Sequence, residues 1–209
     1  MKYKLSDEKN EFFGRTLYRI VCVTAFASVK VGELGGWVES ENNLSQFGDA
    51  WVCGDAKVYG DAEVCGDAEV YGDAEVYGDA WVYGDAEVCG DAKVYGDAKV
   101  YGDAEVYGNA EVYGNAEVYG NAEVYGDAEV CGDADYIVLK NNWSSGRYYT
   151  YTASNKMWKV GCFHGTGEEL IAKAYKDSEL SGKCYEASVR YVEEIERIKA
   201  ECNDGGNDE

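Results

Sequence analysis

One hexapeptide repeats without a gap through almost half of the chain. From Gly48 the sequence runs GDAWVC, GDAKVY, GDAEVC, GDAEVY and onward to a degenerate GDADYI that ends at Ile137, which makes 15 units over 90 residues. Such a repeat is read first because each unit can bury its apolar side chains only against neighbouring units. The repeat therefore sets the architecture of residues 48–137.

Each unit predicts a short strand followed by a corner. Ala and Val share one side of the strand, and Gly-Asp or Gly-Asn then forms a turn. A strand of about four residues is too short for a hairpin meander. Three units would instead form one three-sided coil, with coils stacked at about 4.8 Å and Ala and Val in the core. Residues 36–41 and 42–47 keep the register, so we expect Val38 and Leu44 in the alanine column.

The unit Val58-Tyr59-Gly60-Asp61-Ala62-Glu63 resembles the hexapeptide-repeat proteins that form left-handed parallel β-helices. Val58 and Ala62 fit the aliphatic and small positions of the family pattern, whereas Tyr59 stands where the family has a small or acidic residue. The resemblance implies a mainly β fold. Its centre would be a single-stranded parallel β-helix, left-handed and triangular, with about 18 residues per coil.

We expect a cap at each end, because a solenoid must cover its open edges. Residues 1–47 would form an N-terminal β cap, with strands at 17–25 and 28–31, and an irregular first coil; residues 48–137 would form the β-helix. Residues 138–209 would form a C-terminal α+β cap or oligomerisation region. Its β part would be a meander that follows the repeat, with strands at 136–139, 147–153 and 156–163.

Two helices are predicted in the C-terminal cap. Thr166-Gly167-Glu168-Glu169 resembles a capping box, followed by Leu170, Ile171, Ala174 and Tyr175 on one side of the helix. Ser181-Gly182 would end this helix, and a second would cover about 183–202. Its apolar stripe of Val189, Val192, Ile195 and Ile198 would pack on the meander or, alternatively, mediate homo-oligomerisation.

The charge of the chain restricts its partners. Lys and Arg number 19 against 40 Asp and Glu, a net charge of -21, and residues 48–137 carry 13 Asp, 9 Glu and 3 Lys, or -19. This field argues against direct binding of nucleic acid and against docking on an anionic membrane. The sequence shows no signal peptide or membrane span and no CxxC pair. We therefore expect a cytoplasmic protein with eight reduced cysteines.

Steps of three repeat units predict which outward side chains stack. One column is Trp51, Glu69, Glu87, Glu105 and Glu123; its four glutamates have no lysine among them, so we expect no relief of their repulsion. The next column, Lys57, Glu75, Lys93, Glu111 and Glu129, alternates in charge for four coils. Tyr59, Tyr77, Tyr95 and Tyr113 form a ladder. Two interpretations stay open: a solvated face with stabilising tyrosines, or a surface that binds a basic partner. The candidate partner-binding residues are Glu69, Glu87, Glu105, Glu123, Tyr59, Tyr77, Tyr95 and Tyr113.

The sequence does not favour an enzyme. Hexapeptide-repeat relatives include acyltransferases and carbonic anhydrases whose chemistry depends on histidines, but residues 48–137 contain none. His164 is the only histidine, and although Cys162 could be its nucleophile, nothing identifies a third group to orient the base. We therefore predict no catalytic residues, no metal site and no cofactor.

The segments LGGWVESE, GDAxVY or GNAxVY, and VGCFHGT together resemble proteins encoded by bacteriophages and prophages of gut-type bacteria. This resemblance implies a bacterial cytoplasm and an accessory or counter-defence role. The predicted function is a non-enzymatic binding or scaffold protein that binds a protein partner. The alternatives are a DNA-mimic inhibitor of a host nucleic-acid-binding enzyme and, second, an acyltransferase-like enzyme.

Overall fold

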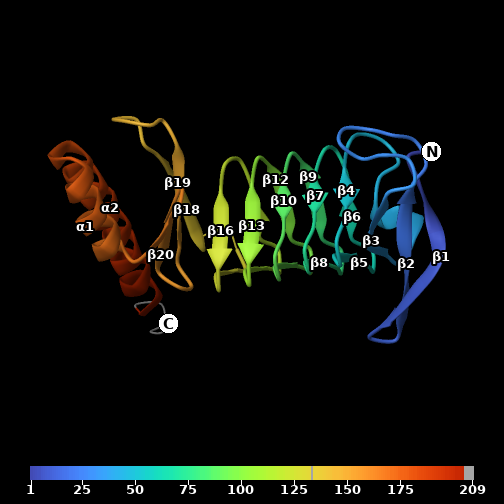
Figure 1. Ribbon diagram of the computed structural model, residues 1–209. Helices are drawn as coiled ribbons and strands as arrows, with labels where there is room; N and C mark the ends of the chain where they lie inside the picture. The colour runs from blue at the N-terminus through green and yellow to red at the C-terminus, as the bar shows by residue number, and fades with distance from the viewer. Residues whose placement is uncertain (133, 205–209) are drawn as a thin grey trace.

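The protein is an elongated, mainly β molecule with a cap at each end of a coil. Its structure is a computed structural model that describes residues 1–132 and 134–204 (Figure 1). The coil is a three-sided parallel β-helix with about five turns, as the repeat predicts, and it is left-handed, as the resemblance to hexapeptide-repeat proteins implies. An antiparallel sheet and two helices follow it, so the predicted fold class is confirmed.

Each side of the coil is a parallel sheet of very short strands. The first face holds β4 (Trp51–Val52), β7 (Glu69–Val70), β10 (Glu87–Val88), β13 (Glu105–Gly108) and β16 (Glu123–Gly126). The second face holds β5 (Lys57–Val58), β8 (Glu75–Val76), β11 (Lys93–Val94), β14 (Glu111–Val112) and β17 (Glu129–Val130). The third face holds β6 (Glu63–Val64), β9 (Trp81–Gly84), β12 (Lys99–Gly102) and β15 (Glu117–Val118).

The core of the coil consists of the Ala and Val of every unit. All of these side chains from Ala50 to Val130 are fully buried. Strand partners lie three units apart in the sequence, as between Glu69 and Glu87 or between Lys93 and Glu111, which confirms the predicted stacking. The corners turn at glycines with positive φ, and from Gly48 to Gly108 each corner glycine lies on the glycine of the next coil.

The register of the first coil differs from the prediction. Val38 pairs with Val58 and Leu44 bridges to Val64, so both lie in the valine column and not in the alanine column. The connection from Leu44 to Val52 is longer by two than a repeat unit, and this shifts the register. A short 3-10 helix (Glu41–Asn43) forms one corner of this irregular coil.

Three strands form the N-terminal cap: β1 (Tyr3–Phe12), β2 (Arg15–Cys22) and β3 (Leu34–Val38). They pair antiparallel with one another, and β3 joins the second face by pairing with β5. The predicted strand at 17–25 corresponds to β2, but 28–31 contributes only a bridge between Phe26 and Val29. β1 was not predicted because its charged residues hide any alternation in an edge strand with a shifted register.

The C-terminal cap begins inside the last repeat unit. β18 (Tyr136–Lys140), β19 (Tyr148–Thr152), β20 (Met157–Val160) and β21 (Phe163–Gly165) form an antiparallel sheet, so Tyr136 and Ile137 belong to this sheet and not to the coil. The predicted meander is confirmed, with its third strand divided into β20 and β21 at Gly161.

Two helices, α1 (Gly167–Asp177) and α2 (Glu179–Asp204), cover this sheet. The predicted capping box of Thr166 and Glu169 is confirmed. The break lies at Ser178 and not at Ser181-Gly182. Gly182 is inside α2, where a Cβ atom would lie 2.3 Å from the ring of Tyr175, so this glycine permits close packing of the helices. Tyr175 is exposed and donates a hydrogen bond to Glu186, unlike the buried Leu170, Ile171 and Ala174.

The two ends of the coil expose opposite backbone groups, and each cap supplies the matching partner. Within the coil, an N–H donates to a carbonyl of the following coil, as from Trp51 to Ala68 at 2.9 Å. Carbonyls are therefore left at the N-terminal end, where Lys2 Nζ donates to Ala50 at 2.7 Å and Asn43 Nδ2 to Gly60 and Ala62 at 3.0 and 2.9 Å.

At the C-terminal end the unpaired groups are amides, and the cap there supplies oxygen acceptors. The hydroxyl oxygens of Thr150 and Ser154 accept from the N–H groups of Glu123 and Glu129 at 2.9 and 2.8 Å. The Asp135 carboxylate accepts from two more amides, those of Cys131 and Gly132. The caps thus satisfy backbone groups that would otherwise be buried without partners.

Candidate binding surface of the coil

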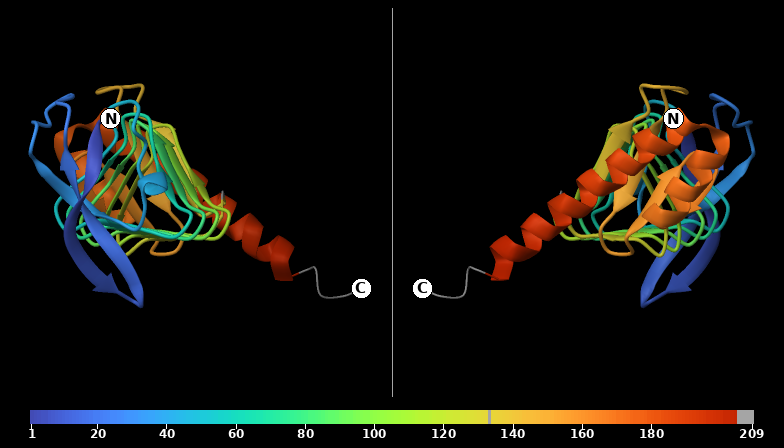
Figure 2. Two further views of the ribbon diagram at one scale, coloured as in Figure 1. Left: turned by 90° about the vertical axis from the view of Figure 1, so that its right-hand side faces the viewer. Right: turned by 90° about the vertical axis from the view of Figure 1, so that its left-hand side faces the viewer.

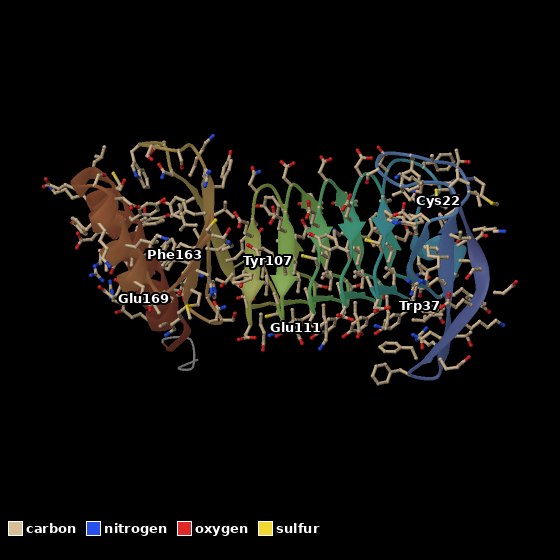
Figure 3. All side chains as sticks on the ribbon, in the orientation of Figure 1. Cys22, Trp37, Tyr107, Glu111, Phe163 and Glu169 are labelled. Carbon is tan, nitrogen blue, oxygen red and sulfur yellow. The ribbon has the colours of Figure 1, made fainter. Side chains whose placement is uncertain are left out.

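The four candidate glutamates lie in one row on the first face, as predicted. Glu69, Glu87, Glu105 and Glu123 occupy adjacent strands in direct register. Glu69 and Glu105 are exposed, whereas Glu87 and Glu123 are half-buried. Side chains with oxygen tips line the outside of the coil along its length (Figure 3). We call this row the glutamate column.

The candidate tyrosines form a stacked ladder on the second face. Their ring centroids are 5.0, 4.9 and 5.2 Å apart from Tyr59 through Tyr77 and Tyr95 to Tyr113, with nearly parallel planes. Tyr59 is buried because Phe12 of the N-terminal hairpin packs edge-on against it. Only Tyr77, Tyr95 and Tyr113 are therefore accessible to a partner.

The structure adds a feature that sequence analysis missed: tyrosine hydroxyls donate hydrogen bonds to glutamates of the following coil. Each glutamate follows its tyrosine by 16 residues in the sequence, two fewer than a full coil of about 18. It is the outward residue of the strand that stacks on the tyrosine's own strand. A search for Tyr and Glu at this one spacing would have found the pairs. They are Tyr59–Glu75, Tyr71–Glu87, Tyr95–Glu111, Tyr101–Glu117, Tyr107–Glu123 and Tyr113–Glu129, at 2.8 to 3.3 Å.

These pairs hold the tyrosines in the neutral form. Burial raises the pKa of Tyr101 to about 12, and the hydrogen bond to Glu117 adds to the shift. Burial is also the largest cause of the raised pKa of Tyr59, Tyr95 and Tyr107, followed by the paired glutamate. For Tyr71, a hydrogen bond with Cys89 raises the pKa most, followed by burial. A phenol that donates to a carboxylate cannot ionise without placing two negative charges together.

We predict that the protein loses stability in alkali as these tyrosines ionise. A raised pKa in the folded state means that the stabilisation is complete below the pKa of unfolded tyrosine, about 10, and is lost as the pH rises through the folded values. The absorbance of tyrosinate, followed against pH, should show ionisation well above that of the urea-unfolded chain. Identical titration curves for the folded and unfolded chains would contradict the hydrogen-bonded arrangement.

A lysine of the C-terminal cap relieves the repulsion at one end of the glutamate column. Lys159 on β20 places its Nζ 3.6 Å from Glu123 and 5.5 and 5.4 Å from the ring centroids of Tyr107 and Tyr125. The expectation that this column has no relief is therefore wrong at its C-terminal end. Sequence analysis could not find this contact because it depends on how the meander folds over the coil.

The rest of the column is crowded with negative charge. The pKa of Glu105 is raised by burial and by the neighbouring carboxylates Glu123 and Glu87, while Lys159 acts in the opposite direction. Among the residues that the structure describes, no ion pair within the chain involves Glu69, Glu87 or Glu105. A hollow of about 260 Å³ adjoins this stretch, with Glu105, Glu123 and Asp103 on the coil side and Arg147 on the cap side.

The N-terminal cap also places cations over aromatic rings, one of the coil and one of the cap itself. Arg15 lies 5.8 Å from the Tyr59 ring and pairs with Glu39 at 2.7 Å, while Arg19 lies 5.0 Å from the Trp37 ring. Both caps thus contact the coil through cations placed over aromatic rings beside carboxylates.

Asparagine replaces aspartate at three successive corners, Asn109, Asn115 and Asn121. Asn109 donates to Asp127 at 2.9 Å and Asn121 to Asp103 at 3.4 Å. An amide can donate to a carboxylate in a neighbouring coil, whereas a second carboxylate would repel it. The Asn109 and Asn121 amides therefore interrupt rows of like charge.

The structure divides the predicted oligomerisation stripe. Val189 and Val192 are buried against the meander, in a core with Tyr149 and Trp158. Ile195 is half-buried and Ile198 is 46% exposed. The four residues therefore do not form one accessible face.

His164 is exposed at the end of the coil and contacts one aromatic ring. Its ring meets Tyr125 edge-on at 4.6 Å, and its pKa is lowered by burial and by Lys159. Cys162 is exposed, and in residues 1–132 and 134–204 no hydrogen bond joins the two side chains. Within the same ranges no group of three or more His, Cys, Asp or Glu side chains is arranged to hold a metal ion.

The geometry defines a capped parallel β-helix with an acidic, tyrosine-rich outer surface. A scan against protein-family models finds no match, and a search of curated proteins finds none either. Over the described part of the chain, no helix has the length and apolar character needed to span a membrane.

Proposed function

We propose that the protein is a non-enzymatic binding scaffold whose glutamate column binds basic side chains of a protein partner. The observation that carries this proposal is the placement of Lys159 between Glu123 and the rings of Tyr107 and Tyr125. The chain's own lysine occupies the kind of place that a partner's lysine or arginine would occupy.

Further along the same face no lysine or arginine of the chain pairs with Glu69, Glu87 or Glu105 in the described residues. Tyr71 donates to Glu87 there and also hydrogen-bonds with Cys89, so one tyrosine ring, and not two, lies beside the carboxylates. The pKa of Glu105 is raised by burial and, after that, by repulsion from Glu123 and Glu87, and a bound cation would relieve this repulsion. Such binding would be strengthened by the net charge of the coil and weakened by salt.

A capture experiment with matched variants tests this proposal. The tagged protein is incubated with a bacterial lysate, the setting that the resemblance implies, and captured proteins are quantified by mass spectrometry. Glu69→Gln with Glu105→Gln removes two charges without removing an acceptor of a tyrosine hydroxyl. Glu63→Gln with Glu129→Gln removes two charges from the other faces, and the amide oxygen introduced at position 129 can still accept from the Tyr113 hydroxyl.

We expect the first variant to lose most of a basic partner that the wild type and the second variant retain. Equal loss from both variants would mean that net charge alone attracts the partner, and would contradict a specific column. Capture of a DNA- or RNA-binding protein would favour the alternative function, mimicry of DNA. Regular rows of exposed aspartates at the corners, such as Asp67, Asp85 and Asp103, favour that alternative.

A further inference from the structure

An apolar stripe runs along the side of α2 that faces away from the core of the cap, although Cys184 and Ile195 within it are half-buried. Leu180, Tyr191 and Ile198 are 59%, 55% and 46% exposed. The residues of the stripe, from the first turn of the helix to its last, are Leu180, Cys184, Ala187, Tyr191, Ile195, Ile198 and Cys202. We call this set the α2 stripe.

The spacing of the α2 stripe is regular. Its members follow one another at intervals of four, three and four residues, and the same set of intervals then repeats from Tyr191 to Cys202. An 11-residue repeat has about 3.67 residues per turn, so its members stay on one side of a helix and can pair with another helix. The stripe covers about 33 Å of helix at about 1.5 Å per residue.

The opposite side of α2 is already occupied. Tyr185, Val189 and Val192 enter the core beneath the sheet, and Gly182 faces Tyr175 of α1. The view onto the C-terminal end shows α2 running diagonally across this end of the molecule, with its last turns beyond the outline of the coil (Figure 2). A partner helix can therefore reach the stripe without displacing the cap.

The charges beside the stripe select the partner and its direction. Helical geometry places Lys183, Arg190, Glu194 and Glu201 along one edge of the stripe, with the cations in the N-terminal half and the anions in the C-terminal half. When two copies of this helix lie antiparallel, Lys183 of one faces Glu201 of the other, and Arg190 faces Glu194. The same edge is then complementary to itself, as a twofold axis requires.

The present ion pairs of these residues can be exchanged. Lys183 pairs with Glu179 at 2.7 Å and Arg190 with Glu168 and Glu193 at 3.0 and 2.8 Å, while Arg197 bonds both Glu194 and Glu201. All of these side chains are exposed, and exposed pairs contribute little to stability. Exchanging them for pairs between two copies therefore costs little.

We infer that α2 pairs along the α2 stripe with α2 of a second copy, antiparallel and about a twofold axis near Tyr191. The C-terminal end of one stripe then lies beside the N-terminal end of the other, with Cys202 beside Leu180 of the second copy and Cys184 beside Ile198 of the second copy. This self-association uses a surface separate from the glutamate column, so it does not rest on the proposed function.

The oligomeric state of the whole chain tests this inference. In a dilution series followed by analytical ultracentrifugation, the wild type should dissociate from dimer to monomer. Tyr191→Glu with Ile198→Glu should leave only monomer, with an unchanged circular dichroism spectrum because Val189 and Val192 still pack in the core. Phe47→Glu, a change of an exposed residue in the N-terminal half of the chain, should leave the dimer intact.

Charge reversal and cross-linking test the antiparallel direction. Arg190→Glu should weaken the dimer, and adding Glu194→Arg should restore it. Under mild oxidation Leu180→Cys should form a disulfide-linked dimer, which Cys202→Ser in the same chain should abolish. A wild type that remains monomeric at every concentration would overturn the inference. So would a wild-type dimer cross-linked through Cys202 of both copies, because that product requires parallel helices.

Discussion

Replacing Gly84 by alanine should destabilise the coil by about 3 kcal/mol, far more than the same change at Gly120. Gly84 has φ +76° and lies on Gly102 of the next coil, so an added Cβ would sit 2.9 Å from the Gly102 nitrogen. That contact is with backbone, which can move only by separating two coils. The strain of positive φ adds about 1 to 2 kcal/mol.

The variant Gly120→Ala separates the steric contact of the added Cβ from the strain of positive φ. Its φ is +67°, but an added Cβ would meet no heavy atom within 4 Å. Gly120→Ala should therefore cost only the backbone strain, about 1 kcal/mol. Urea unfolding of the two variants and the wild type measures the difference. If both variants lost the same stability, close stacking of the corners would not be what requires glycine.

Asn43→Asp should lower the free energy of unfolding by about 3 kcal/mol or more, because it replaces an amide that donates two hydrogen bonds with a carboxylate that donates none. The Asn43 amide is fully buried and donates to the carbonyls of Gly60 and Ala62, two of the groups left unpaired at the start of the coil. The aspartate would lose both hydrogen bonds and place its charge beside two carbonyl oxygens. Thermal unfolding should show a large fall in midpoint.

The neighbouring Asn42→Asp is the matched control, because it makes the same chemical change at an exposed position. It should leave stability nearly unchanged at neutral pH. The loss in Asn43→Asp should shrink in acid, where the protonated carboxyl can donate one hydrogen bond. A neutral effect of Asn43→Asp would show that the first coil does not depend on this side chain.

The coil was predictable because the repeat encodes both its strand and its corner in every unit. Counting in steps of three units placed the glutamate column and the tyrosine ladder correctly, since register in a regular solenoid follows from the repeat. Counting failed where the chain departs from the repeat. Val38 and Leu44 were misplaced because two additional residues follow Leu44 before β4.

The caps were less predictable because tertiary contacts decide their details. Nothing in the local sequence of β20 indicates that Lys159 reaches Glu123 across the end of the coil. On α2, a spacing of three residues suggested one stripe from Val189 to Ile198. An α-helix has about 3.6 residues per turn, so residues spaced by three drift around the helix, and this stripe crosses from the buried side to the outward side. The 11-residue spacing was present in the sequence and identifies the outward side.

Capture of a partner at two salt concentrations tests the central claim most directly. The tagged wild-type protein is exposed to a bacterial lysate at about 0.1 M salt and again at about 1 M, where the screening length falls from about 10 Å to 3 Å. We predict a basic protein that is bound at low salt and released at high salt. Recovery of only the protein itself, or of a partner held equally well at both concentrations, would contradict binding through the glutamate column.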